Sequence, residues 1–307
     1  MPRTVSIGYQ EFDDIINNHI FYVDKTNFIK EWWEGKDRVT LITRPRRFGK
    51  TLCMSMVEQF FSVEHANSDL FHDLRIWNDE NYRKLQGTYP VISLSFSDIK
   101  ENSYKQVRNK ICESIVDLYN HYDFLAAGDL LNRREKEYFY KVSASMEDSE
   151  ASIALKRLSG YLYKYYNKKV IILLDEYDTP MLEAYSGGYW EELVAFTRSL
   201  FNATFKNNPY LERAILTGIT RISKESIFSD VVVTILRLSP QHLRNMPIAS
   251  ALQKRRFLPP WMNMGIPNKK LTSGPGMMDL LSVMLRISIT RGPSLIFWTQ
   301  GNCSRIG

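Results

Sequence analysis

The sequence has no apolar run of about 18 residues, the length a membrane-spanning helix needs, and no charged-then-apolar leader opens it. We therefore expect neither a membrane span nor a signal peptide. Cysteine is scarce, and the three present, Cys53, Cys112 and Cys303, do not have the spacing of metal ligands. They are expected to be small core residues of a protein in a reducing compartment, which indicates the cytoplasm.

Acidic residues and tyrosine are nearly missing from residues 231–307. This segment has ten basic residues, one acidic residue and no tyrosine, which gives a formal charge of +9. Residues 1–230 hold 30 basic residues, 33 acidic residues and all 17 tyrosines, a formal charge of −3. So abrupt a change indicates a domain boundary, and a basic tail usually indicates nucleic-acid binding.

What is present in residues 1–230 is a pattern of alternating strands and helices. Hydrophobic residues make up 44% of the chain and aromatic residues 13%, which is typical of a folded globular protein. Val-, Ile- and Leu-rich runs predict buried parallel strands at 38–44, 89–96, 168–177 and 212–219. Helical stretches are expected at 51–62, 103–122 and 191–205. This alternation predicts an α/β fold, a parallel sheet with helices on both faces.

Gly49-Lys50-Thr51 follows the first predicted strand, where a helix begins. Backbone N–H groups and the helix dipole bind phosphate at such a point. Lys50 would neutralise the charge of the β- and γ-phosphates, and the Thr51 hydroxyl would hold Mg²⁺. The usual first glycine of a phosphate loop is replaced by Arg44. From this motif alone, a basic turn that contacts solvent or another anion is the alternative.

Asp175 and Glu176 end the third predicted strand. An acid at the carboxyl end of a buried parallel strand faces the crevice where ligands bind. Asp175 would support Mg²⁺, and Glu176 could polarise the attacking water as general base. A strand that simply ends in solvated acids is the alternative. Together with the strand–Gly-Lys-Thr–helix pattern, the acid pair makes a chance match much less plausible and predicts a nucleotide site.

The strand at 89–96 lies between these two motifs in sequence. That arrangement is typical of the P-loop NTPase division with an additional strand and a catalytic glutamate. In that division the next strand ends in a polar sensor close to the γ-phosphate. The strand at 212–219 supplies Thr217 for this role, and Arg221 follows as a further γ-phosphate contact or as a surface residue.

Residues 5–230 resemble the bacterial AAA-ATPase-like family, whose members usually end in a restriction-endonuclease-like nuclease domain. The matching stretches are "FYVDKTNFIKEW", "LITRPRRFGKTLCMSM", "YPVISLSFSDIK", "VIILLDEYDTPM" and "NNPYLERAILTGITRISKESIFSD". The resemblance implies ATP rather than GTP, with Mg²⁺ on Thr51 and Asp175. It also implies that the phosphate loop is degenerate at its first position and binds nucleotide through Arg44, Arg46, Arg47, Phe48, Gly49, Lys50, Thr51 and Leu52.

The same resemblance places Tyr22, Asp24 and Lys25 beside the nucleotide, near its base. A core aromatic is the alternative for Tyr22. Arg46 and Arg47 could contact phosphate or a neighbouring subunit of a homo-oligomer. The sequence does not choose between these roles.

The resemblance stops after residue 230, and the family's Trp-Tyr-Asp-Gly-Phe and Tyr-Asn-Pro-Trp-Ser-Ile segments are missing. Residues 275–282 can be written in permitted codons and then read in a shifted frame, in which the third base of each codon begins a new codon. In that frame the segment reads Trp-Tyr-Asp-Gly-Phe-Thr-Phe. The same offset gives Tyr-Asn-Pro-Trp-Ser-Ile within residues 286–307 and Asp-Glu-Tyr-Gly at residues 261–265, in the family's order. We therefore hypothesise that residues from about 231 onward are translated out of frame, through a natural frameshift or a sequencing error.

The tail's basic charge would then be a coding artefact, and residues 231–307 should be poorly packed, with at most short helices. The following strand, the helical lid and the nuclease domain would be lost, leaving the first strand near an uncovered sheet edge. Direct nucleic-acid binding is not supported for the mildly acidic residues 1–230. These residues are expected to form an ATP-binding domain with ATPase activity. A nucleotide-binding switch without turnover and an inactive remnant are the alternatives.

Overall fold

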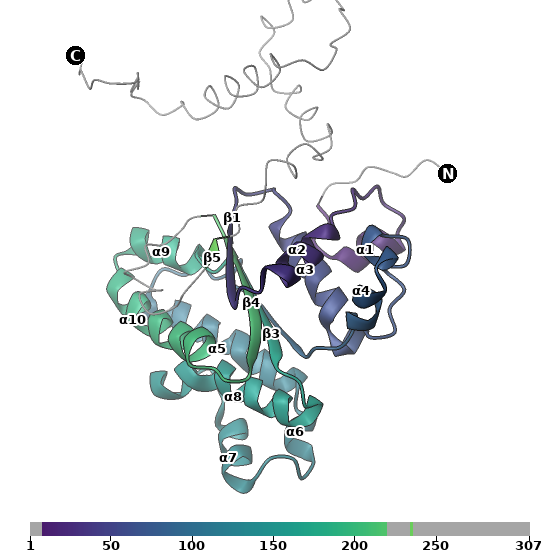
Figure 1. Ribbon diagram of the computed structural model, residues 1–307. Coiled ribbons are helices and arrows are strands. Elements are labelled where there is room, and N and C mark those ends of the chain that lie inside the picture. The colour runs from purple at the N-terminus through teal and green to yellow at the C-terminus, as the bar shows by residue number, and fades with distance from the viewer. Residues whose placement is uncertain (1–7, 220–233, 236–307) are drawn as a thin grey trace, which may run out of the picture. The chain divides into compact units, whose positions relative to one another are not determined.

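The computed structural model of the chain describes residues 8–219 and the backbone of residues 234–235 (Figure 1). Within them, parallel strands form one sheet in the order β2-β3-β4-β1-β5. The strands are β1 (Val39–Thr43), β2 (Val91–Ser95), β3 (Val170–Asp175), β4 (Leu211–Gly218) and the two-residue β5 (Thr234–Ile235). The first four lie where the apolar runs predict strands, so the predicted parallel α/β sheet is confirmed.

The register of the sheet brings the predicted motifs together at the carboxyl ends of the strands. β4 lies between β1 and β3, and it pairs with β1 up to Thr43 opposite Gly218. On its other side, β4 pairs with β3 up to Leu216 opposite Leu174. Because the strands are parallel, the carboxyl ends of β1, β4 and β3 lie next to one another, with Thr217 in the middle strand.

β5 corrects the expectation of an uncovered edge. Thr234 pairs with Thr40 and Ile235 pairs with Leu41, so β1 has a neighbour on this side at two positions. The physical reason is that Thr234 and Ile235 are β-branched residues, which favour an extended backbone. Apart from these two positions, the predicted tail at 231–307 lies outside the described residues, as does Arg221.

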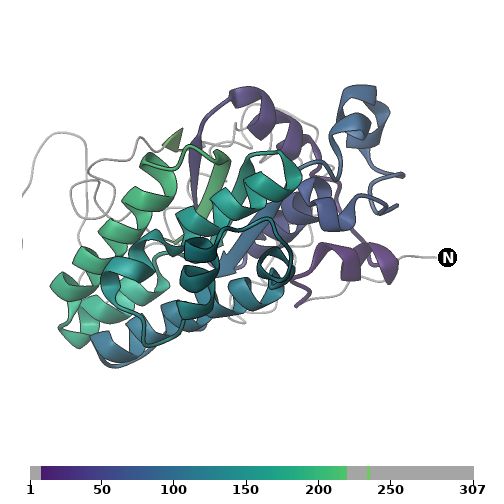
Figure 2. The same ribbon diagram turned by 90° about the horizontal axis from the view of Figure 1, so that it is seen from below.

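Helices cover both faces of the sheet (Figures 1 and 2). One face carries α1 (Phe12–Asn17), α2 (Asn27–Gly35), α3 (Lys50–Phe61) and α4 (Glu80–Leu85), with the short 3₁₀ helices η1 (Val63–His65) and η2 (Arg75–Asn78). The other face carries α5 (Tyr104–His121), α6 (Phe124–Ala127), α7 (Arg133–Lys141), α8 (Asp148–Tyr166), α9 (Thr179–Gly187), α10 (Trp190–Phe201) and the π-helix η3 (Asn202–Lys206). The predicted helices correspond to α3, α5 and α10.

Side chains of β3 alternate between two hydrophobic cores. Ile171 and Leu173 pack with the helices α1–α4, whereas Ile172 and Leu174 pack with the helices α5–α10. All four side chains are fully buried or nearly so. A strand covered on both faces needs apolar residues at every position, which explains the uninterrupted run "VIILL".

The described cysteines are consistent with packing roles. Cys112, a residue of α5, is buried in the core, and Cys53 is half-buried in α3. Among the described residues, no group of three or more His, Cys, Asp or Glu side chains could hold a metal ion. Within the same residues, no helix combines the length and the apolar character needed to cross a membrane.

Candidate functional site

The loop between β1 and α3 has its unusual backbone at its end rather than at its start. Arg47 and Gly49 have φ angles of +67° and +72°, and Gly49 caps the N-terminus of α3. Arg44 does not have a positive φ, and its N–H donates to the Gly218 carbonyl over 3.1 Å. Arg44 therefore extends the pairing of β1 with β4. This position of the loop needs no glycine.

Lys50 is the first residue of α3, and its side chain is only 4% exposed. The ammonium folds back over the loop and donates to the carbonyls of Arg44 at 3.2 Å and Pro45 at 3.5 Å. It also forms an ion pair of 3.3 Å with Glu176 Oε1. The cation is thus held where the loop, the N-terminus of α3 and the end of β3 meet.

Asp175 joins three elements of the site. Its Oδ2 accepts a hydrogen bond of 2.7 Å from the Thr51 hydroxyl, and its Oδ1 accepts one from the Thr217 hydroxyl. Asp175 is 5% exposed and Thr217 is fully buried. The structure therefore brings together three predicted residues, one each from α3, β3 and β4.

Glu176 has an unusual backbone conformation and several hydrogen-bond partners. Its φ of +52° lies in the left-handed region, which is uncommon for a residue with a side chain. Its N–H donates to the Thr217 hydroxyl over 3.2 Å. Its Oε2 accepts a hydrogen bond of 3.1 Å from the hydroxyl of Thr179, the first residue of α9. The sequence analysis missed Thr179, although its position at the start of a helix three residues after Glu176 was a usable signal.

Thr51 and Asp175 offer the oxygen ligands that Mg²⁺ prefers. Mg²⁺ in nucleotide sites usually takes one or two protein oxygens and completes its shell with phosphate and water. A hydroxyl and a carboxylate within hydrogen-bonding distance fit that use.

Asp24 holds its own segment in place. Its Oδ1 accepts hydrogen bonds from the N–H of Thr26 at 2.9 Å and from the Thr26 hydroxyl at 2.6 Å. Its Oδ2 accepts from the N–H of Arg75 at 2.7 Å, and the Thr26 hydroxyl in turn accepts from the N–H of Ile76. Asp24 Oδ2 and the Thr26 hydroxyl thereby connect residues 24–26 to η2, whereas Asp24 Oδ1 bonds within the segment.

Tyr22 and Lys25 have different surroundings. The Tyr22 hydroxyl donates to Met56 Sδ and accepts from the Lys25 N–H, and its ring packs edge-on against Phe12. Burial raises the pKa of Tyr22 well above its ordinary value. Lys25 is exposed, and its Nζ lies 4.0 Å from the point that a Cβ on Gly49 would occupy. The residue of this segment that reaches the loop is thus Lys25, while Tyr22 packs against α3.

The remaining predicted residues lie in the loop itself and in the first turn of α3. Arg46, Arg47 and Phe48 are exposed, with 46% of Phe48 accessible. Leu52 is half-buried and packs with the core beside α3. The next residue, Cys53, has a thiol whose pKa is raised to about 12, chiefly by burial and further by the charge of Asp175. The thiol stays protonated near neutral pH and supplies no nucleophile to the site.

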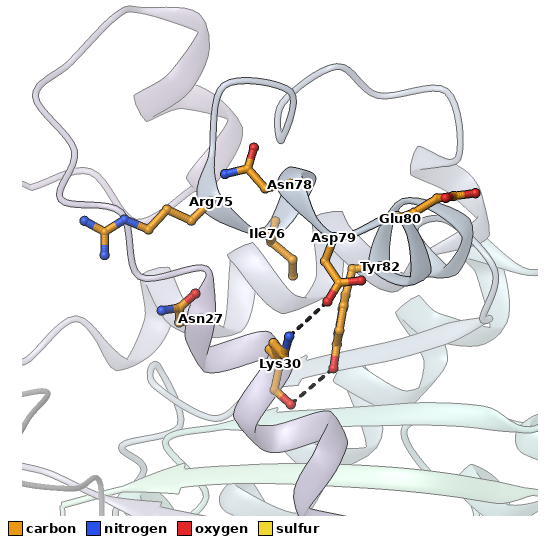
Figure 3. Close-up of a pocket in the computed structure, with 8 residues that line it drawn as sticks. All are labelled: Asn27, Lys30, Arg75, Ile76, Asn78, Asp79, Glu80 and Tyr82. Carbon is orange, nitrogen blue, oxygen red and sulfur yellow. Dashed lines mark hydrogen bonds and ion pairs between the residues drawn. The ribbon is translucent and has the colours of Figure 1, made fainter.

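A separate cavity of about 370 Å³ lies among α2, η2 and α4 (Figure 3). Lys30 and Asp79 form an ion pair of 2.9 Å across it, and the Tyr82 hydroxyl donates to the Lys30 carbonyl. The other residues that line it are Asn27, Arg75, Ile76, Asn78 and Glu80. The polar groups joined in this way satisfy one another, so we assign the functional site to the loop and not to this cavity.

Gly218→Ala is expected to destabilise the site. A Cβ there would lie 2.6 Å from Asp178 Oδ1 and 2.8 Å from Tyr177 Cε1, closer than real contacts allow. Overpacking of this kind costs about 1–3 kcal/mol, so thermal unfolding should show a clearly lower Tm. Gly128→Ala is the matched control, because a Cβ there meets nothing within 4 Å. Equal Tm values for the two variants would contradict this packing.

Comparison with known proteins adds a family and one weak relative. A family model described as "Predicted AAA-ATPase" matches residues 6–228. An "Uncharacterized protein in vnfD 5'region" of Azotobacter chroococcum mcd 1 is 25% identical over 229 residues, which is 74% of this chain. The chain spans 39% of that relative's length. No solved structure matches the chain.

Proposed function

The chain belongs to the AAA-ATPase-like family of predicted AAA-ATPases, and from this premise we propose that residues 1–230 bind ATP with Mg²⁺ and hydrolyse it. The observation that carries the proposal is the hydrogen-bonded group of Thr51, Asp175 and Thr217 beside Lys50 and Glu176. The helix terminus proposed to bind phosphate, the pair proposed to bind the metal and the proposed general base thus lie together at the carboxyl end of the sheet.

The strand order supports the additional-strand, catalytic-glutamate type of P-loop NTPase. β4 lies between β1, which precedes the loop, and β3, which ends in Asp175. This spacing places the buried Thr217 between the loop and the acids. Its hydroxyl contacts both the Asp175 carboxylate and the Glu176 N–H, so one side chain fixes the proposed metal ligand and the proposed base relative to each other.

Two lysines would neutralise the phosphates. Lys50 approaches from the first turn of α3, and Lys25 approaches Gly49 from residues 22–26. The Lys25 position supports a phosphate contact rather than the base contact implied by the family resemblance. Mg²⁺, held by Thr51 and Asp175, would supply further neutralisation across the β- and γ-phosphates.

Glu176 would act as the general base. A water positioned beside the γ-phosphate would lose its proton to this carboxylate as it attacks phosphorus. Arg46 and Arg47 are exposed within the loop, where either phosphate or a neighbouring copy of the chain can reach them.

A nucleotide-binding switch without turnover is the second candidate function. The observation that favours it is that both Glu176 oxygens have partners, Lys50 and Thr179. With the base held in this way, the protein hydrolyses ATP only if nucleotide binding breaks one of these two contacts. An inactive remnant of a disrupted gene is a third alternative, in which no ATP is bound.

ATP binding and hydrolysis by the purified 307-residue chain, measured beside a fragment of residues 1–230, test the proposal. We expect both proteins to bind ATP and hydrolysis to stop when EDTA removes Mg²⁺. Binding without hydrolysis would favour the switch. No binding by either protein would overturn the proposed function.

We also propose that the residues from about 231 onward are read out of frame. Three ordered matches in one codon offset support this. Resequencing the gene is the test. Codons that cannot be regrouped into the three predicted segments would end the hypothesis.

A further inference from the structure

We propose that Thr179 positions Glu176 for catalysis, and that the ion pair between Lys50 and Glu176 is a latch opened by the γ-phosphate of ATP. The inference rests on the proposed function and adds to it a positioning residue and a means of regulation. The supporting observation is that the two carboxylate oxygens of Glu176 have different partners, the Lys50 ammonium and the neutral Thr179 hydroxyl.

Thr179 contacts Glu176 twice. Its hydroxyl donates to Glu176 Oε2 over 3.1 Å, and its N–H donates to the Glu176 carbonyl over 3.0 Å. Thr179 is 4% exposed, so little water competes for its hydroxyl. The threonine therefore fixes both the backbone and the side chain of the residue three positions before it.

The backbone of Glu176 needs such support. A φ of +52° is unfavourable for a residue with a Cβ and persists only where the surroundings impose it. The Thr217 hydroxyl accepts the Glu176 N–H, and Thr179 holds the carbonyl. The two threonines thus hydrogen-bond the peptide groups on either side of the Glu176 Cα. This directs the side chain toward Lys50.

Lys50 is the partner that ATP can remove. Its ammonium contacts the carbonyls of Arg44 and Pro45 and the Oε1 of Glu176. A γ-phosphate carries more negative charge than a carboxylate and forms strong charge-assisted hydrogen bonds. Phosphate would therefore draw Lys50 away from Oε1, whereas Oε2 would stay on the neutral Thr179 hydroxyl.

The hydrolysis step then uses the released oxygen. The water oxygen forms a bond to the γ-phosphorus as the bond from phosphorus to the β–γ bridging oxygen breaks. The electron pair of that bond leaves with ADP, and a water proton passes to Oε1 of Glu176. Because the latch opens when the γ-phosphate draws Lys50 away, the base would stay paired with Lys50 in the empty site.

The test compares Thr179→Val, which removes the hydroxyl, with Thr179→Ser, which keeps it, in the full chain with Mg²⁺ and ATP. We expect Thr179→Val to lower kcat by about 10- to 100-fold, the loss of one hydrogen bond to a charged group, with the Kd for ATP changed less than about threefold. Thr179→Ser should restore kcat to within about threefold of the original chain. Thr204→Val, which removes a buried threonine hydroxyl from η3, is the control and should leave both values unchanged.

The outcomes separate this inference from the proposed function. An original chain that hydrolyses ATP, with Thr179→Val as active as Thr204→Val, overturns the inference alone. So does a Thr179→Val variant whose Kd rises as much as its kcat falls, because that is a structural effect. If Thr179→Val does not fold, Thr179→Ala removes the same hydroxyl and replaces it in the comparison. An original chain without hydrolysis overturns the proposed function, and this inference with it.

Discussion

Glu176→Gln is expected to abolish ATP turnover while leaving ATP binding intact, with kcat lower by about 10²- to 10⁴-fold, the usual contribution of a general base. Glutamine has nearly the same shape and still accepts a hydrogen bond from the Thr179 hydroxyl, but it cannot take a proton from water. The negative charge that pairs with Lys50 is also lost, so ATP should bind at least as tightly. Single-turnover hydrolysis and calorimetric titration with ATP measure the two effects separately.

Glu191→Gln is the control, because Glu191 is exposed at the start of α10 and its neutralisation changes the overall charge by the same amount. It should leave kcat and Kd unchanged. Turnover that survives in Glu176→Gln at the level of Glu191→Gln would remove Glu176 from the mechanism. Loss of ATP binding would show instead that this carboxylate supports the fold of the site.

Lys50→Met is expected to weaken ATP binding by about 10- to 100-fold, the effect of losing a hydrogen bond to a charged group. Methionine preserves most of the apolar stem of this nearly buried side chain, so the change acts mainly on the charge. The substitution takes the ammonium away from the phosphates and leaves Glu176 Oε1 without its cation. Calorimetric titration with ATP and Mg²⁺ gives the change in Kd directly.

Two further lysine variants show whether the loss of ATP affinity is specific to Lys50. Lys25→Met should weaken binding by only about two- to fivefold, because Lys25 is exposed and its interactions are screened by water. Lys169→Met removes an exposed charge just before β3, at the opposite end of the strand from Asp175, and should have no effect. A Kd for Lys50→Met equal to that of Lys169→Met would show that the loop does not bind phosphate.

The amino-acid sequence by itself determined the main elements of the fold. Four strands lie where Val-, Ile- and Leu-rich runs predict them, because a strand buried on both faces must be apolar at every position. The sequence also placed Gly49-Lys50-Thr51 at a strand-to-helix junction and Asp175-Glu176 at a strand end. Local composition decides such features, so they can be read without contacts between distant residues.

Tertiary structure alone decided which partners the side chains of the candidate site contact. Thr51 and Asp175 are 124 positions apart, and no local pattern states that their oxygens meet. The same holds for Asp24, which is engaged with η2, and for Lys25, which reaches Gly49. Arg44 can replace a glycine because β4 supplies a hydrogen-bond partner that keeps its backbone out of the left-handed region. Hydrogen bonds act over about 3 Å between groups that only packing of the whole sheet brings together, which is why sequence could name these residues but not their partners.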